Sequence, residues 1–268
     1  MTRQDALGEG SPTASPRRRP LRVAVGALGD LLFTAGVLLA LLVAYSLWWT
    51  DLTATRHAGV AAEQLRRSWS AAAPAAPPAG PTAPAGPADP TGPAAPPPVG
   101  PGDGIGFLHV PALGADYQVL IRIGTDEETL AEGVAGVYTT PYPAAMPWEP
   151  EGNFALAAHR DGHGAMFHDL DLLKPGDPLV VETRDRWYVY RVDATLPETS
   201  KDDTGVIAPV PTGSPYTAPG RYITLTTCTP VYTSLYRMAV WGSLVREQPV
   251  DPGRTPPPEL RRREPPNG

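Results

Sequence analysis

The chain has 268 residues and a formal net charge of −6, and its 35 prolines and 27 glycines are spread unevenly. The acidic balance excludes nucleic acid as a partner recognised through a basic surface. The bias toward proline and glycine indicates that only about half of the chain folds into a compact domain.

Residues 1–22 are polar and turn-rich and end in a cluster of arginines, which indicates a basic cytoplasmic tail. Residues 23–49 are almost entirely apolar, and their uncharged run over 31–49 approaches the ~20 residues that a membrane-spanning helix needs. The alternatives are a buried core helix and a cleaved signal peptide, but the run exceeds the apolar core of a signal peptide. We therefore predict a single-pass helix in the plasma membrane, with the N-terminus inside and everything after Asp51 outside.

Residues 50–103 are expected to form a stalk and a disordered linker. The first part, 51–70, could continue the helix, although its apolar positions make no clear stripe. Residues 71–101 are nearly all Ala, Pro, Gly and Thr, so they cannot bury enough apolar surface to fold. Extended at ~3.1 Å per residue, this linker would span on the order of 90 Å and let a tethered domain sample a thick cell wall.

Residues 104–248 change character, because short β-rich runs alternate with Gly, Pro, Asp and Asn. This pattern predicts an all-β fold with short helices, a barrel or a sandwich. The candidate strands are 106–110, 117–121, 153–158, 179–183, 187–194, 222–227 and 237–245, of which the fourth and fifth form a hairpin. One short helix is expected over 125–132, with Thr125 and Glu128 as a capping box, and another over 166–173. Residues 249–268 read as a disordered tail rich in Pro and Arg.

The only cysteine, Cys228, ends a run of β-branched and aromatic residues that Pro230 terminates. In a strand it would share a face with Thr224 and Thr226, at the C-terminal end where a reactive thiol could be placed. A lone cysteine is, however, more often a small buried apolar side chain than a nucleophile. Cys228 alone does not decide between these two interpretations.

Two further residues have chemical potential. His159 projects from the end of a strand on the face of two alanines, just before a Gly-rich turn, so it is either a catalytic base or a turn residue. Arg237 opens the strand after Cys228, and an antiparallel pairing of these strands would bring the two residues side by side. The alternative is that Arg237 is a charge that blunts the edge of a sheet.

The motifs Thr-Leu-Thr-Thr-Cys-Thr-Pro, the following strand-opening Arg, Ala-x-His-Arg and Leu-Lys-Pro-Gly-Asp occur in an order that resembles the sortase family of cysteine transpeptidases. The resemblance covers residues 104–245, and the membrane anchor and Pro-rich linker match the usual layout of that family. Among its classes the chain is most similar to class E of high-GC actinobacteria. The resemblance implies a closed β-barrel of about eight strands.

The resemblance also assigns roles, residue by residue. Cys228 matches the nucleophile, His159 the general acid and base, and Arg237 the cation that holds the substrate and the developing oxyanion. Their neighbours, Thr226, Thr227, Tyr138 and Ala158, are the expected substrate-binding residues. The family commonly has Gly-His-Arg where this chain reads Ala-His-Arg from Ala158. It commonly has Gly-x-Gly-His-Tyr where this chain reads Ala-Gly-Val-Tyr up to Tyr138, and an extra loop follows over 139–152. These differences affect the substrate groove but leave the three catalytic residues intact.

The function implied is transpeptidation, in which a sorting signal near the C-terminus of a secreted protein is cut between Thr and Gly. The acyl group then passes to an amine of a peptidoglycan precursor or cross-bridge. Class E resemblance favours Leu-Ala-x-Thr-Gly over Leu-Pro-x-Thr-Gly. The alternatives are a pilin-polymerising sortase, an inactive sortase-like module that binds wall proteins, and an L,D-transpeptidase. The last would show a Ser-His-Gly-Cys block that is missing here.

The loop over 196–220 lies where the family places its specificity loop, so we expect it to line the groove. Its two adjacent acidic residues, Asp202 and Asp203, together with Glu127 and Glu128, could indicate a calcium site. Adjacent acidic residues are more often a solvated face, and we therefore predict no metal and no cofactor.

Overall fold

The computed structural model describes residues 18–71, 100 and 102–261, so the predictions for the first 17 residues and for most of the linker lie outside the described residues. It divides into two units, residues 1–48 and 49–268, and each is treated by itself below.

The first unit is the N-terminal part of helix α1 (Arg18–Ala71). Within it, Val23–Val43 forms a 21-residue segment with a mean hydropathy of 2.1, and none of it is buried in the protein. Among the described residues this is the one helix whose length and composition suffice to cross a membrane. It fits a single-pass membrane anchor.

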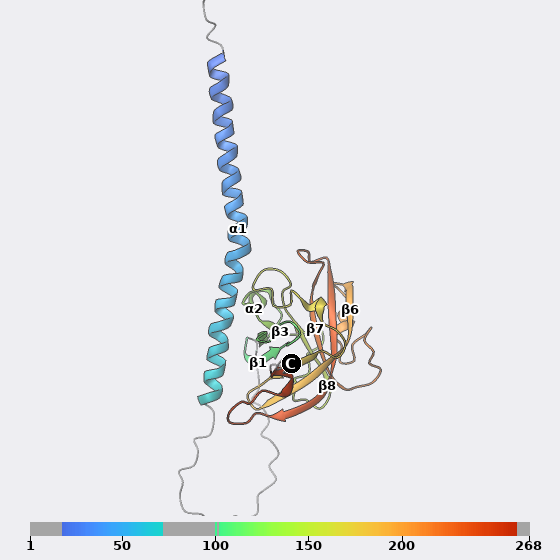
Figure 1. The fold of residues 1–268 in the computed structure, drawn as a ribbon. Helices are drawn as coiled ribbons and strands as arrows, with labels where there is room; N and C mark the ends of the chain where they lie inside the picture. Colours follow the sequence, from blue (N-terminus) through green and yellow to red (C-terminus); the bar gives the residue numbers. More distant parts are fainter. Residues whose placement is uncertain (1–17, 72–99, 101, 262–268) are drawn as a thin grey trace, which may run out of the picture. The chain divides into compact units, whose positions relative to one another are not determined.

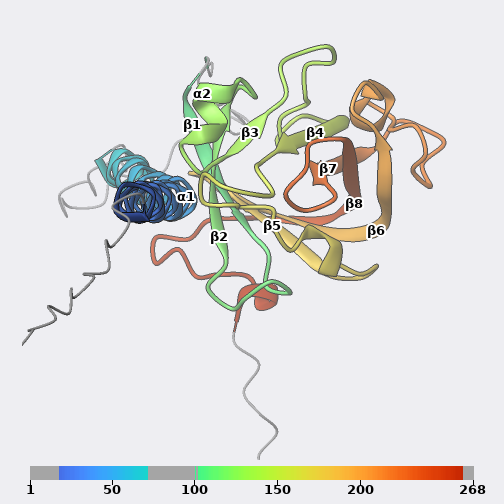
Figure 2. The same cartoon turned by 90° about the horizontal axis from the view of Figure 1, so that it is seen from above.

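The second unit is built around a closed eight-stranded barrel (Figures 1 and 2), which confirms the predicted all-β fold. The order of strands around the barrel is β1, β2, β3, β4, β7, β8, β6 and β5. The strands are β1 (Gly104–His109), β2 (Gln118–Ile123), β3 (Ala135–Val137), β4 (Gly152–Ala157), β5 (Pro178–Glu182), β6 (Arg186–Ser200), β7 (Arg221–Thr229) and β8 (Tyr236–Pro249). The predicted hairpin is present as the antiparallel pair β5 and β6.

Two strands depart from the prediction. The three-residue strand β3 was not predicted, because a buried run this short carries no periodicity. Strand β6 continues to Ser200, well beyond the predicted end at residue 194, because it pairs with β8 as far as Ser200 and Tyr236. The predicted loop over 196–220 therefore starts only after β6, at residue 201.

The helical segments also differ from the prediction. Helix α2 (Glu127–Ala131) is present, but its N-cap is Asp126 and not Thr125. The Asp126 carboxylate accepts hydrogen bonds from the Thr129 backbone N–H at 2.9 Å and from its hydroxyl at 2.8 Å. The helix predicted over 166–173 is only the short 3₁₀ turn η1 (Leu170–Leu172). Two further 3₁₀ turns are η2 (Thr204–Ile207) and η3 (Pro258–Leu260).

Strand β4 shows how alternation builds the interior. Phe154, Leu156 and Ala158 lie in the main core inside the barrel, whereas Ala155 on the other face packs in a second cluster with Trp241. The predicted division of this segment into two faces is therefore confirmed. The second cluster also contains Val206 of η2, so the segment after β6 is packed onto the outside of β4 and β8.

The C-terminal part of α1, from residue 49, belongs to the second unit and packs on the barrel wall. Leu65 and Trp69 contact a cluster whose buried members include Phe107 of β1 and Leu120 of β2. The Trp69 and Phe107 rings meet edge to face, with centroids 5.5 Å apart. The helix that continues from the apolar segment therefore supplies part of the cover of the folded domain.

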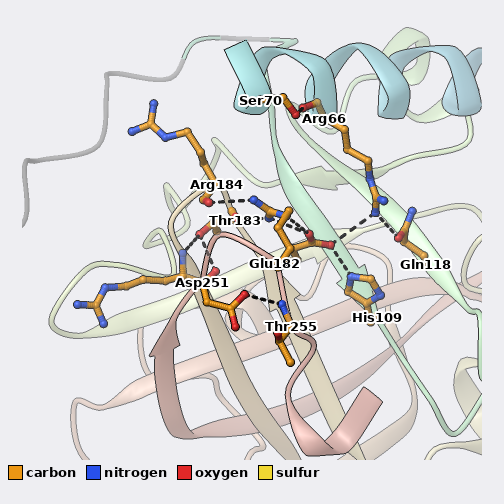
Figure 3. Close-up of polar contacts among 11 residues, drawn as sticks. Arg66, Ser70, His109, Gln118, Glu182, Thr183, Arg184, Asp251 and Thr255 are labelled. Atoms are coloured by element: carbon orange, nitrogen blue, oxygen red, sulfur yellow. Dashed lines mark hydrogen bonds and ion pairs between the residues drawn. The ribbon is translucent and has the colours of Figure 1, made fainter. Parts of the chain in front are cut away.

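Beside this contact lies a polar cluster centred on Glu182 of β5, which is only 4% exposed (Figure 3). One carboxylate oxygen lies 2.9 Å from His109 Nε2 and 3.6 Å from Arg66 Nη2. The other accepts hydrogen bonds from Arg254, at 2.8 Å from Nη2 and 3.1 Å from Nε. Burial by itself raises the pKa of Glu182, but its hydrogen bonds with His109 and Arg254 outweigh burial and leave the pKa below its ordinary value.

Composition predicted a disordered tail from residue 249, but the structure describes the chain as far as residue 261. Arg254 bonds to Glu182 and stacks over the Trp69 ring at 4.6 Å. Val250 and Leu260 pack against Trp187 and its neighbours on the outer face of β5 and β6. Residues 250–260 therefore cover part of the outer face of β5 and β6.

A second contact of α1 involves three small residues. Ala54 is 3% exposed, and a Cβ added to Gly133 would lie 3.3 Å from the Ala54 backbone and methyl group. A Cβ added to Gly164 would lie 3.8 Å from the same methyl group and 2.7 Å from Met166 Cε. The backbones at Gly133 and Gly164 therefore pass close to α1 because neither residue has a side chain.

Candidate active site

The parallel pairing of β4 with β7 places His159 and Cys228 at the same level of the barrel. Ala157 pairs with Thr226, and each candidate residue follows two positions later on its own strand. The Thr227 hydroxyl donates a hydrogen bond to the Ala158 carbonyl at 2.9 Å, which holds the two segments together just before these residues. In Figure 2, β4, β7 and β8 lie side by side. Cys228 is a free, partly exposed thiol.

Arg237 faces Cys228 across the antiparallel pair of β7 and β8, as the sequence predicted, because the two residues are direct partners in the register. Its Nη1 donates to the carbonyls of Tyr236 at 3.0 Å and Ser234 at 3.3 Å, which ties the guanidinium to the loop between the strands. Within the described part of the chain, Arg237 pairs with no carboxylate. Its positive charge is therefore not neutralised by a protein anion at the end of β7.

His159 has an unusual environment for a histidine. Its Nε2 is buried and has no hydrogen-bond partner in the described part of the chain. Burial lowers the pKa of His159, the nearby His163 lowers it further, and Glu127 of α2 acts in the opposite direction. The neutral imidazole is therefore favoured until a ligand or a neighbouring charge changes the balance.

Among the residues that the structure describes, no carboxylate forms a hydrogen bond with His159 as the third member of a triad. The nearest acidic residue in sequence, Asp161, accepts a hydrogen bond from the Tyr232 backbone N–H at 2.7 Å instead. This bond links the loop after β4 to the loop between β7 and β8. Asp161 therefore connects the two loops that flank the site.

In the sequence Arg160 is only part of a motif, yet its buried guanidinium supports the end of β7. It is 5% exposed and pairs with Asp171 at 2.7 Å. Its Nη1 also donates to the Thr229 hydroxyl at 3.1 Å and to the Cys228 carbonyl at 3.4 Å. A charged residue next to a candidate catalytic histidine was the available signal, but only the fold shows where its guanidinium lies.

The four expected substrate-binding residues fall into two pairs. Tyr138 and Thr226 share a hydrogen bond of 2.9 Å between their hydroxyls, and burial raises the pKa of Tyr138. Both Arg237 and Cys228 are close enough to influence this pKa electrostatically. The Thr227 and Ala158 side chains are buried, so they can shape a groove only through the strands that they hold.

The segment over 201–220 is tied to the barrel at several points. Trp241 Nε1 donates to the Val206 carbonyl at 3.0 Å, and Asn153 Nδ2 donates to the Ala208 carbonyl at 3.0 Å. Asp203 caps η2 and accepts a hydrogen bond from the Thr199 hydroxyl at 2.6 Å. The described residues contain no group of three or more His, Cys, Asp or Glu side chains that could hold a metal ion.

Comparison with known proteins identifies the family to which this chain is similar. A family model described as the sortase domain matches residues 108–245. Sortase SrtE2 of Streptomyces coelicolor is 50% identical over 249 residues, which cover 91% of this chain and 92% of that protein. Sortase SrtE1 of the same organism is 41% identical over 87% of this chain, which spans 60% of that protein's length.

Among solved structures, the barrel is similar to the crystal structure of sortase E1 from Streptomyces coelicolor with a tripeptide in the active site. The TM-score is 0.57 and the identity is 45%, over 60% of this chain and 99% of that chain.

Proposed function

Because this chain belongs to the sortase family and is a cysteine transpeptidase of class E type, we propose that it cuts sorting signals of secreted proteins and transfers them to a cell-wall amine. The observation that carries this proposal is the register that brings Cys228 opposite Arg237 and level with His159. The expected signal is Leu-Ala-x-Thr-Gly, cut between Thr and Gly. A tripeptide in the active site of the similar sortase E1 supports a peptide substrate.

In the proposed reaction, the Cys228 thiolate attacks the Thr carbonyl carbon and forms a tetrahedral intermediate whose oxygen carries a negative charge. The Arg237 guanidinium stabilises this oxyanion, since it is permanently charged and can donate two hydrogen bonds at once. The C–N bond then breaks, and His159 gives its proton to the departing Gly amine. The product is a thioester between Cys228 and the Thr residue of the signal.

The second half of the proposed reaction runs the same steps in reverse order. An amine of the cell wall attacks the thioester carbon, and the now neutral His159 accepts the proton that this amine loses. The C–S bond breaks and the Cys228 thiolate is restored. The described residues contribute the nucleophile, the proton carrier and the oxyanion ligand, and the acceptor contributes the amine.

We place this reaction outside the cell, with α1 as a single-pass anchor in the plasma membrane. The apolar segment Val23–Val43 and the arginines before it support this orientation, since arginine flanks tend to stay on the cytoplasmic side. Tagging each end of the chain and testing its access to an impermeant protease in intact cells would check the orientation. Digestion of an N-terminal tag in intact cells would contradict it.

The substrate proposal is tested by incubating the full chain in detergent micelles with Leu-Ala-x-Thr-Gly and Leu-Pro-x-Thr-Gly peptides and an amine acceptor. We expect faster cleavage of the Ala peptide, a thioacyl enzyme visible by mass spectrometry, and a transpeptidation product. A clear preference for the Pro peptide would contradict the proposed signal. No thioacyl species with either peptide would contradict the proposed reaction.

A further inference from the structure

The loop after β4 has an unusual backbone. Four consecutive residues, Gly162 to Ala165, all have positive φ values, of 64°, 48°, 81° and 44°. Two of them, His163 and Ala165, are not glycine, and left-handed backbone is unfavourable for such residues. The Ala165 N–H donates to the Gly162 carbonyl at 2.8 Å and closes the turn. Such strain persists only where the surrounding structure imposes it.

The surrounding structure does impose this path. The Phe167 N–H donates to the His159 carbonyl at 3.0 Å, so the loop returns to the residue where it began. Phe167 itself is fully buried in the core. Gly164 adopts a φ of 81°, which favours glycine, and it passes close to Met166, because an added Cβ would lie 2.7 Å from Met166 Cε. The loop is therefore held at both ends and in its middle.

The result of this path is that the His163 ring lies against the His159 ring. The two centroids are 5.0 Å apart and the ring planes are inclined by 31°. Since the buried His159 Nε2 has no hydrogen-bond partner in the described part of the chain, no such bond at that atom fixes the imidazole. Ring contact with His163 is the described interaction that can hold it.

Other charged and titratable groups lie on the elements near His159. Glu127 faces it from α2, and Cys228 and Arg237 occupy the ends of β7 and β8. Asp161, in the same loop, is engaged with the Tyr232 backbone. Of these groups, His163 is the one in ring contact with His159, and its positive charge opposes a second positive charge there.

We propose that His163 is a positioning residue for His159: its ring holds the imidazole in place, and a positive charge at this position opposes a positive charge on the His159 imidazole. This inference rests on the proposed function, in which His159 gives a proton to the departing amine and later accepts one from the incoming amine. A positive charge at position 163 makes His159 release its proton more readily, whereas an uncharged ring there lets His159 keep it.

Three substitutions at one position separate the two roles. His163→Phe keeps a flat ring but cannot carry a proton, His163→Ala removes the ring, and His163→Arg keeps a positive charge at every working pH. The full chain, in detergent micelles and labelled at the histidine rings, is titrated by NMR. The same samples give kcat and KM for a sorting-signal peptide as a function of pH, and thermal melts show whether each variant is folded.

We expect the pKa of His159 to be higher in His163→Phe than in the unchanged protein, and lower in His163→Arg than in His163→Phe. The limb of the pH–rate profile that His159 governs should move in the same direction. His163→Ala should lose on the order of 10-fold in kcat with little change in KM, because an imidazole that is no longer held is displaced from the reacting atoms. His163→Phe should keep most of the kcat of the unchanged protein.

An unchanged titration of His159 in His163→Phe would overturn the electrostatic part of the proposal. Equal kcat values in His163→Ala, His163→Phe and the unchanged protein would overturn the holding role. The NMR titration needs no turnover, so it reports on the contact between the rings even if the chain cleaves no sorting peptide. Failure of the proposed function and failure of this inference are therefore distinguishable.

Discussion

At the ends of β4 and β7, the Nε2 atom of His159 is buried and has no hydrogen-bond partner, and Arg237 has no carboxylate partner, among the described residues. On the barrel wall, by contrast, the Glu182 carboxylate uses both oxygens and is shared by His109, Arg66 and Arg254. Both regions are polar and contain buried polar atoms. The difference is that Glu182 is saturated with partners, whereas the candidate site keeps bonding capacity that a substrate can use.

The largest loss of activity is expected from a substitution of the thiol in the candidate site. Cys228→Ala removes the proposed nucleophile, and the sequence contains no other cysteine to replace it. Cleavage and transfer of the sorting peptide should fall below detection, and no thioacyl enzyme should appear by mass spectrometry. A melting curve like that of the unchanged protein is the control for folding. Residual transfer at a substantial rate would show that the free thiol of this region is not the reacting group.

The second largest loss of activity is expected at Arg237, whose charge has no carboxylate partner among the described residues. Arg237→Lys keeps the charge but loses the planar fork, so we expect kcat/KM to fall on the order of 10²-fold, or about 2.7 kcal/mol of transition-state stabilisation. Stability should change little, because the described hydrogen bonds of Arg237 go only to exposed loop carbonyls. Near-normal turnover, together with inactive His159→Ala, would make Arg237 a structural edge cation.

In the saturated region, the same kind of substitution should affect stability instead. Glu182→Gln leaves two arginines without their shared anion, and we expect a loss of about 2 kcal/mol in the free energy of unfolding. This value is discounted from the usual buried pair because Arg66 and Arg254 are partly exposed. The matched control is Glu247→Gln, which breaks exposed ion pairs with Arg186 and Arg221 and should cost less than ~1 kcal/mol. Equal losses in urea unfolding would remove the distinction between buried and exposed pairs.

The Glu182 cluster also predicts a pH dependence of stability. Because the folded-state pKa of Glu182 lies below its ordinary value of 4.5, its contribution is fully present above pH 4.5. The contribution is lost as the pH falls through the lower folded-state pKa. The stability difference between the unchanged protein and Glu182→Gln should therefore shrink in that acidic range and stay constant near neutral pH. A difference that is the same at every pH would contradict the assigned pKa.

The smallest effect is expected at Asp203, whose carboxylate accepts hydrogen bonds from the Thr199 hydroxyl of β6 and from the Gly205 N–H of η2. Asp203→Ala should cost about 1 kcal/mol through loss of the cap of η2. Turnover should be the same with added calcium and with a chelator, both in this variant and in the unchanged protein. Activation by calcium that Asp203→Ala abolishes would show that this loop holds a metal ion.

Much of the second unit could be predicted, because alternation in β4, β7 and β8 fixes which face of each strand is buried. The pairing of Cys228 with Arg237 followed from strand order and a short connecting loop. Strand β3 and the extension of β6 could not be predicted, since their residues are stabilised by pairing with distant strands and not by local pattern.

The site was predictable in its chemistry but not in its support. Residue type and motif order identified Cys228, His159 and Arg237 as candidates. The contact between His159 and His163 depends on four left-handed residues in a row, and two of these are not glycine. Sequence reasoning assigns left-handed backbone to glycine by default, so such a path is visible only in three dimensions.

The cover that α1 and residues 250–261 give the barrel has a practical consequence for anyone who shortens this protein. The family match spans residues 108–245, but Phe107 and Leu120 are covered by Leu65 and Trp69, and Glu182 is paired with Arg66 and Arg254. A chain trimmed to the matched residues would lack Phe107, expose the apolar surface around Leu120 to water, and leave the buried Glu182 carboxylate without its two arginine partners. Aggregation of such a fragment would then result from where it was truncated. A fragment that retains residues 54–69 and 250–261 should remain soluble.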